Sequence, residues 1–173
     1  NAGTFSDAPG QAACTKCVAG TYQGDEGATA CVECSEHSWC GEGSSAPTPC
    51  EAGYVGRGTG LSIKSQCELC PAGSWCPAAS TLATLIPCPR GYYCPEGSLA
   101  PKAHPCPAGR FGQRKGLGDE ACDGDCFAGY YCDPGSVSPT QSPCPAGRFS
   151  SEPGLSSEAG CAECAPGHYC EEG

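Results

Sequence analysis

Residues 143–164 read PCPAGRFSSEPGLSSEAGCAEC, and this stretch contains every element of the pattern that decides the fold. Its first cysteine is followed three residues later by glycine, five residues later by an aromatic residue, and then by a second cysteine. Such an anchor cysteine recurs every 16 to 20 residues along the chain, at Cys17, Cys34, Cys50, Cys70, Cys88, Cys106, Cys126, Cys144 and Cys164. Repetition at a short, nearly fixed period is typical of repeat proteins.

Glycine and an aromatic residue complete the repeat. Glycine stands three residues after every anchor except Cys34, where His37 replaces it, and it allows a turn with positive φ. Five residues after Cys50 the aromatic residue is replaced by Val55, and Tyr54 precedes it. We expect the aromatic side chains to pack over neighbouring disulfides, because sulfur–aromatic contacts are favourable: Tyr22, Trp39, Trp75, Tyr93, Phe111, Tyr131, Phe149 and Tyr169. An exposed aromatic ladder that binds sugar or peptide is the alternative.

The composition predicts that disulfides, and not an apolar core, stabilise the fold. Leu, Ile, Val and Phe together make only 17 of the 173 residues, too few to offset the chain entropy lost on folding. The 19 cysteines indicate a disulfide scaffold made in an oxidising compartment, so we expect an extracellular or cell-surface protein. The spacing of Cys14, Cys17, Cys31 and Cys34 also fits zinc, but most other windows lack a second C-x2-C pair.

The cysteines divide into anchors and followers. Wide pairs are Cys17/Cys31, Cys50/Cys67, Cys106/Cys122 and Cys144/Cys161, and close pairs are Cys34/Cys40, Cys70/Cys76, Cys88/Cys94, Cys126/Cys132 and Cys164/Cys170. We expect each anchor to bond its own follower, most firmly for Cys17–Cys31 and Cys106–Cys122. A scheme that crosses adjacent close units, such as Cys70–Cys88 with Cys76–Cys94, stays open, because spacing alone does not fix connectivity.

This pairing leaves Cys14 without a partner. Gly3 and Phe5 stand where the glycine and the aromatic residue belong if a cysteine came directly before Asn1. We therefore expect Cys14 to pair outside this segment, with a cysteine immediately upstream.

The repeat predicts the fold class: small disulfide-rich repeats of irregular short β-hairpins with almost no helix, stacked into an elongated rod. The 26 glycines and 17 prolines favour turns and extended segments over helices. The predicted units are 1–16 (partial), 17–33, 34–49, 50–69, 70–87, 88–105, 106–125, 126–143, 144–163 and 164–173 (partial).

Several segments resemble ephrin-receptor-like repeats, a cysteine-rich module of the growth-factor-receptor and tumour-necrosis-factor-receptor type. They are CPAGSWC (70–76), PCPRGYYCPEGS (87–98), PCPAGRF (105–111) and residues 143–164. The resemblance covers essentially the whole chain, with His37 and Val55 as departures. It implies an extracellular, non-enzymatic role, either in a receptor ectodomain or in a secreted filament protein such as those of algal and protist mastigonemes.

Chemical sites are scarce in the sequence. The three histidines, His37, His104 and His168, lie in different units, so we expect no enzyme, no catalytic residue and no cofactor. The acidic stretch 119–125 is the one candidate for calcium, although its order does not match a calcium-binding loop. The net charge of −10 argues against nucleic acid and anionic membranes as partners.

The function we expect is structural. The chain would form part of an extracellular filament, coat or appendage through self-association or contact with other chains of the same filament, without inserting into a membrane. The alternative is a receptor-like ectodomain stalk that binds a protein ligand. The stretches 44–49 and 136–143 are candidates for O-linked or hydroxyproline-linked glycans.

Overall fold

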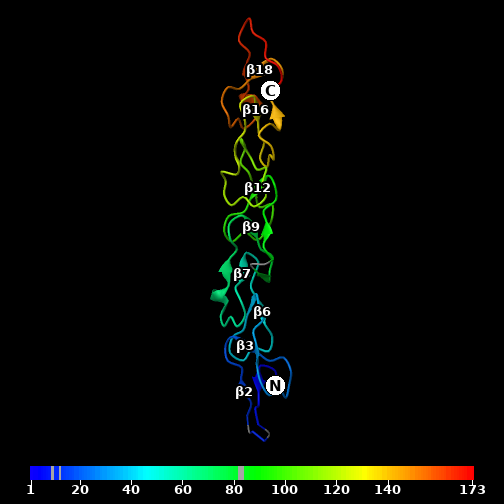
Figure 1. The fold of residues 1–173 in the computed structure, drawn as a ribbon, viewed down its shortest axis with the longest axis vertical. Coiled ribbons are helices and arrows are strands. Elements are labelled where there is room, and N and C mark those ends of the chain that lie inside the picture. The colour runs from blue at the N-terminus through cyan, green and yellow to red at the C-terminus, as the bar shows by residue number, and fades with distance from the viewer. Residues whose placement is uncertain (9, 12, 82–83) are drawn as a thin grey trace. The chain divides into compact units, whose positions relative to one another are not determined.

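The computed structural model describes residues 1–8, 10–11, 13–81 and 84–173. In this part of the chain the regular structure consists of very short strands and two 3₁₀ turns, with no α-helix (Figure 1). The 3₁₀ turns are η1 (Lys64–Gln66) and η3 (Glu158–Gly160), and each lies directly before the second cysteine of a wide pair. The prediction of short β-hairpins with almost no helix is therefore confirmed.

Each repeat folds as one hairpin. The first strand covers the fourth and fifth residues after the anchor, and the second ends directly before the next anchor. Eight antiparallel hairpins follow this plan: β1 (Thr4–Phe5) with β2 (Thr15–Lys16), β3 (Thr21–Tyr22) with β4 (Val32–Glu33), β5 (Ser38–Trp39) with β6 (Thr48–Pro49), β9 (Ser74–Trp75) with β11 (Ile86–Pro87), β12 (Tyr92–Tyr93) with β13 (His104–Pro105), β14 (Arg110–Phe111) with β15 (Gly124–Asp125), β16 (Tyr130–Tyr131) with β17 (Ser142–Pro143), and β18 (Arg148–Phe149) with β19 (Ala162–Glu163).

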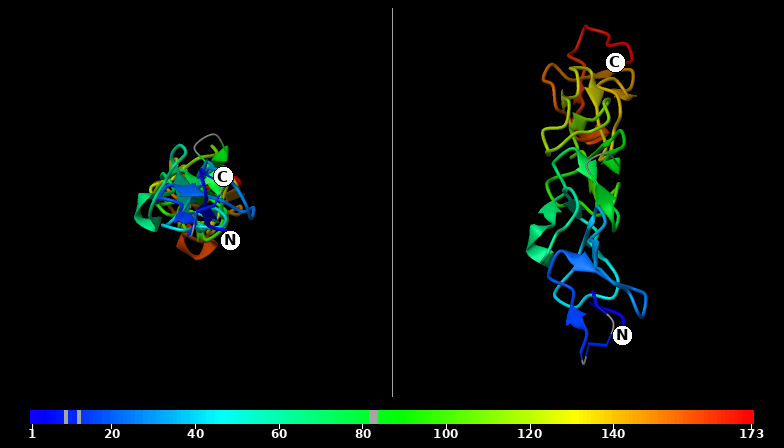
Figure 2. Two further views of the ribbon diagram at one scale, coloured as in Figure 1. Left: turned by 90° about the horizontal axis from the view of Figure 1, so that it is seen from below. Right: turned by 60° about the horizontal axis from the view of Figure 1, so that its bottom comes forward.

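One sheet has three strands and shows how a repeat joins the next. β7 (Tyr54–Gly56) pairs antiparallel with β8 (Glu68–Leu69) of its own repeat and parallel with β10 (Ser80–Thr81) of the following repeat. Elsewhere the same parallel contact is a single bridge, as between Trp39 and Leu61. Short arrows joined by turns can be followed in the right view of Figure 2.

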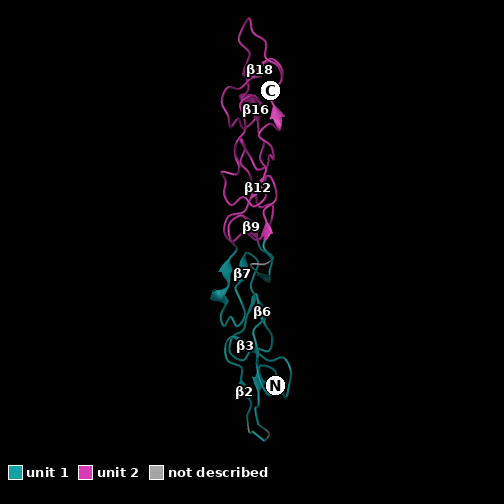
Figure 3. Ribbon diagram, viewed as in Figure 1, with its two compact units in different colours: residues 1–70, 76–85 teal, residues 71–75, 86–173 magenta. Residues whose placement is uncertain are grey.

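The chain divides into two compact units, coloured separately in Figure 3. Unit 1 comprises residues 1–70 and 76–85, and unit 2 comprises residues 71–75 and 86–173. The hydrogen bonds and contacts given below join residues of the same unit.

Cysteine makes up most of the core in both units. Of the 17 buried apolar residues in the described ranges, 14 are cysteines, and the others are Val55, Leu61 and Leu117. Disulfides thus replace the apolar interior that the composition cannot supply. Among the described residues no helix is long and apolar enough to cross a membrane.

Candidate functional site

Nine disulfides form the frame of the repeats, and each joins an anchor cysteine to its own follower. The wide bonds are Cys17–Cys31, Cys50–Cys67, Cys106–Cys122 and Cys144–Cys161. The close bonds, with a sequence separation of 6, are Cys34–Cys40, Cys70–Cys76, Cys88–Cys94, Cys126–Cys132 and Cys164–Cys170. Cys14 is exposed and is the free cysteine among the residues described.

Backbone hydrogen bonds link each repeat to its neighbour at the same positions. The N–H of every anchor donates to the carbonyl of the third residue after the preceding anchor, as Cys106 does to Gly91 at 2.8 Å. The N–H of Gly91 in turn donates to the Gly112 carbonyl, also at 2.8 Å. Because these bonds use only the backbone, they recur although the side chains between anchors differ.

The glycine position is needed because the backbones of repeats approach closely there. Gly91 has φ +78°, and a Cβ at this residue would lie 2.3 Å from the carbonyl oxygen of Gly135. His37, the one non-glycine at this position, keeps the same turn with φ +60°. Its buried Nδ1 has no hydrogen-bond partner among the residues that the structure describes. A left-handed backbone at a bulky residue is costly, so His37 is a local strain point in its repeat.

Sequence reasoning missed a second recurrent position, which receives the contact from the preceding repeat. In close repeats it is a serine ten residues after the anchor, and in three of the four wide repeats it is a leucine eleven residues after the anchor. Ser136 is 1% exposed, and its hydroxyl donates to the Asp133 carbonyl at 2.7 Å. Leu117 is 7% exposed and bridges to Tyr93. Both spacings are readable in the sequence.

Most of the aromatic side chains lie at the surface of this frame, half-buried. Trp39 packs against the Cys50–Cys67 disulfide and Leu61, which is the arrangement expected for this residue class. The packing expectation does not describe Phe149 and Tyr169, which are 41% and 86% exposed.

The other ring residues named from the sequence, Tyr22, Trp75, Tyr93, Phe111 and Tyr131, are intermediate in burial. Tyr93 lies beside His104, with ring centroids 5.4 Å apart. Val55, the departure from the aromatic pattern, is only 1% exposed and contacts the cluster of Cys70 and Cys76. Valine in place of an aromatic residue therefore puts a smaller side chain in β7, where the backbone of the next repeat pairs with this strand.

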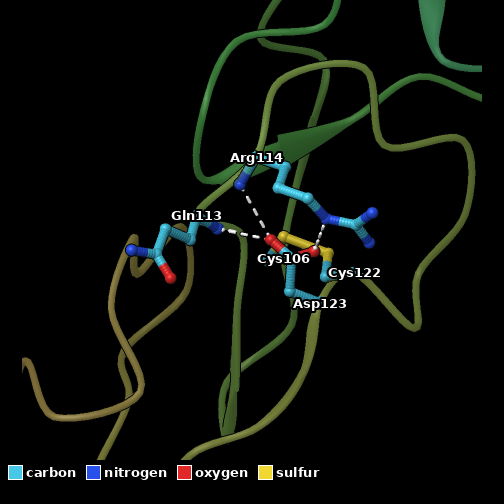
Figure 4. A network of polar contacts seen from close by, with 5 residues as sticks. All are labelled: Cys106, Gln113, Arg114, Cys122 and Asp123. Carbon is cyan, nitrogen blue, oxygen red and sulfur yellow. Dashed lines mark hydrogen bonds and ion pairs between the residues drawn. A yellow bond between two sulfur atoms is a disulfide. The ribbon is translucent and has the colours of Figure 1, made fainter.

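Aspartates of the acidic stretch 119–125 accept hydrogen bonds from other groups of the protein, and Figure 4 shows those of Asp123. The Asp123 carboxylate accepts hydrogen bonds from the backbone N–H groups of Gln113 and Arg114 at 2.7 and 2.8 Å, and from Nε of Arg114 at 2.5 Å. Asp119 accepts from the N–H of Ala121. No group of three or more His, Cys, Asp or Glu side chains in the described part of the chain is placed to hold a metal.

Asp123 is the carboxyl with the clearest change in acidity. Its side chain is 9% exposed, and this burial raises its pKa. Hydrogen bonds from Arg114 and Gln113, together with the guanidinium charge, outweigh burial and hold the pKa of Asp123 below the ordinary aspartate value. Asp123 therefore acts as a fixed anion that orders the loop between Cys106 and Cys122.

Hydroxyls in the two candidate glycan stretches are partly used by the fold. Ser44 donates to the Gly41 carbonyl at 2.8 Å, and Ser136 is buried, as described above. Ser45 and Thr140 are exposed, so the glycan prediction stays with residues of this kind. The histidines remain dispersed: His104 and His168 are exposed and His37 is partly buried, each in a different repeat.

Unit 1 contains a sizeable pocket whose lining includes aromatic side chains. Its volume is about 510 Å³. Its lining includes Trp39 and Pro49 of one hairpin and Tyr54 and Lys64 of the next repeat. Glu51 and Lys64 form an ion pair of 2.7 Å at the rim. Trp39 and Tyr54 lie in different repeats and belong to no common sequence motif. The sequence near either residue therefore does not predict the pocket.

Comparison with known proteins identifies the module. Residues 3–50 match the family model described as tyrosine-protein kinase ephrin type A/B receptor-like. This part of the chain is an ephrin-receptor-like cysteine-rich region. No curated protein matches the chain. Repeats of this family are extracellular receptor-type or structural modules and are typically non-catalytic.

Proposed function

We propose that these ephrin-receptor-like repeats serve as a structural, non-enzymatic part of a secreted protein that builds an extracellular filament, coat or appendage. The observation that supports this most is the set of backbone hydrogen bonds between repeats. All nine anchors donate to the same position of the preceding repeat, at 2.8 to 3.0 Å. Hydrogen bonding between neighbouring repeats suits a protein whose function depends on an uninterrupted series of repeats.

The surface also fits this role. The net charge of −10 favours solubility and keeps chains apart until specific contacts form. The ion pairs at the surface, such as Lys16–Glu42, are exposed and contribute little to stability. The disulfide frame therefore has to provide the durability of an extracellular material.

The decisive experiment is electron microscopy of unreduced material secreted by the source cells, with gold-labelled antibody raised against residues 1–173. Label along ordered filaments or coats is the expected result. Antibody pre-absorbed with the purified chain is the control. Label confined to dispersed particles or to cell membranes would contradict the structural role.

A pair of glycine variants tests whether the contact between repeats matters for stability. Gly91→Ala introduces a Cβ that would lie 2.3 Å from the Gly135 carbonyl oxygen. Gly147 has a similar φ of +84°, but no atom lies within 4 Å of the position that a Cβ would take, so Gly147→Ala carries only the backbone cost, about 1 kcal/mol. We expect Gly91→Ala to lower amide protection of its repeat clearly more than Gly147→Ala does. Equal effects would show that the contact contributes nothing.

The receptor-like stalk that binds a protein ligand is the second candidate. It is favoured by the family match, whose description names a receptor. The same microscopy separates the two functions, because a receptor-like protein would be labelled singly on cell membranes.

A further inference from the structure

We propose that the pocket of unit 1, between Trp39 and Tyr54, binds a ring of a neutral oligosaccharide. This inference does not rest on the structural role proposed above. The volume of about 510 Å³ lies within the range of about 300–1,000 Å³ that is usual for small-molecule sites. The lining combines flat aromatic surface with a few polar groups, which is the usual composition of such sites.

The aromatic side of the pocket is preorganised. Trp39 packs against Leu61 and the Cys50–Cys67 disulfide, and this covalent bond restrains the position of the ring. Its strand is paired with β6, in which Thr48 lies opposite Trp39. A ring that is already held in place costs little entropy to use as a binding platform. The apolar C–H face of a sugar ring can stack on such a surface.

The polar side offers both donors and acceptors. Glu51 uses Oε1 to accept from Lys64 at 2.7 Å, which leaves its second carboxylate oxygen for another donor. The Lys64 ammonium has three N–H groups, and this contact uses one of them. Thr48 and Ser65 add hydroxyl groups to the lining.

The ligand has to match this mixture. Glu51 and Lys64 carry opposite charges and cancel at the rim, so the pocket favours a neutral molecule over an anion or a cation. A sugar hydroxyl can donate to the carboxylate and accept from the ammonium. A proline-rich peptide would offer carbonyl acceptors and few donors, so it would give the second carboxylate oxygen of Glu51 no hydrogen bond. The pattern therefore favours a neutral sugar.

The two tryptophans of the chain supply the measurement. Trp39 lines the pocket, and Trp75 occupies the same repeat position in unit 2. In the full chain with Trp75→Phe, Trp39 is the only tryptophan, and its fluorescence reports on the pocket. We would titrate this protein with neutral trisaccharides of glucose, mannose, galactose and xylose. A saturable change in Trp39 emission with at least one of them is expected.

Matched variants assign the site. In calorimetry with that trisaccharide, Trp39→Ala should weaken binding at least about tenfold, whereas Trp75→Ala should leave it unchanged. Glu51→Gln should weaken it by about threefold to tenfold, because a charge-assisted acceptor is lost. Glu68→Gln is its control, since Glu68 also forms an exposed ion pair, with Arg57, and does not line the pocket.

Trp39→Phe keeps an aromatic platform, and intact disulfides are verified for every variant by non-reducing peptide mapping. Phe should retain most of the binding that Ala loses. The proposal is overturned if no trisaccharide binds by about 10 mM, or if Trp75→Ala weakens binding as much as Trp39→Ala. Saturable binding of a hexaproline peptide at Trp39, without sugar binding, would also overturn it.

Discussion

The repeats that begin at Cys50 and Cys106 share one plan but fill their long loop differently. Their disulfides span 17 and 16 residues, and each buries a leucine at the same position, Leu61 and Leu117. In the Cys106 repeat a buried carboxylate fastens the loop from within. In the Cys50 repeat the loop instead borders the aromatic pocket.

A single extra residue accounts for much of this difference. Two residues separate Cys67 from Cys70, whereas three separate Cys122 from Cys126. Glu68 therefore lies in β8, opposite Val55, and its side chain is 49% exposed. Asp123 lies directly before β15, and its carboxylate accepts hydrogen bonds from the N–H groups of the loop. The disulfides fix the ends of both loops. The residues between the second cysteine and the next anchor then determine which side chains lie inside each loop.

The largest expected effect is on the feature that the two repeats share. Removing either wide disulfide, as Cys50→Ala/Cys67→Ala or Cys106→Ala/Cys122→Ala, should cost about 2–5 kcal/mol of local stability. The two losses should agree within about 1 kcal/mol, because loops of nearly equal length lose similar closure entropy. Hydrogen exchange of the amides in each repeat measures this loss without assuming that the chain unfolds as one unit.

A much smaller loss in one double variant would contradict the view that the disulfide is the common frame. Cys14→Ala is the control for loss of a thiol, because Cys14 is exposed and unbonded among the described residues. It should leave exchange in both repeats unchanged.

The next effect distinguishes the two repeats. Asp123→Ala should destabilise the Cys106 repeat by about 1–3 kcal/mol, because it leaves the N–H groups of Gln113 and Arg114 without their acceptor. Glu68→Ala should cost at most about 0.5 kcal/mol, because the Arg57–Glu68 pair is exposed. Hydrogen exchange of the two loops measures both. Equal losses would show that burial of Asp123 does not matter.

The same contrast has a pH dependence. The pKa of Asp123 is lower in the folded protein, so its contribution is complete above the unfolded value of about 3.9 and is lost as pH falls through the folded value below it. The amide NMR signals of Gln113 and Arg114 should shift with a midpoint below that of an ordinary aspartate. Asp123→Asn should abolish the transition, and a midpoint above about 4 would contradict the assignment.

The comparison also shows which features a sequence can reveal. The fold class and the family follow from cysteine, glycine and aromatic spacings, because these residues meet the same local requirement in every repeat. The contact of Ser136 or Leu117 with the preceding repeat is harder to find, because its spacing from the anchor differs by one residue between close and wide repeats.

The two loop interiors are not predictable in the same way. Asp123 lies in the acidic stretch 119–125, which the sequence offers as a calcium-binding candidate. The sequence does not show that the carboxylate oxygens of Asp123 accept hydrogen bonds from Arg114 instead. The pocket depends on Trp39 and Tyr54, which belong to successive repeats and line one pocket only in the folded chain. This pair of side chains recurs in no other repeat that the structure describes as a pocket lining, so it leaves no periodic signal.

The smallest expected effect concerns the charged rim of the pocket. Hydrogen bonding and the charge of Glu51 raise the pKa of Lys64, so any contribution of the pair would be present below the ordinary lysine pKa and lost as pH rises through the folded value. Both side chains are largely exposed, at 60% and 65%, and water screens their attraction. Lys64→Gln and Glu51→Gln should therefore leave the thermal midpoint unchanged at neutral pH. A clear drop in the thermal midpoint would show that the Glu51–Lys64 pair stabilises its repeat, as Asp123 is expected to stabilise the Cys106 repeat. An unchanged midpoint leaves the rim free to serve a ligand, so that any binding lost in Glu51→Gln is due to the missing acceptor.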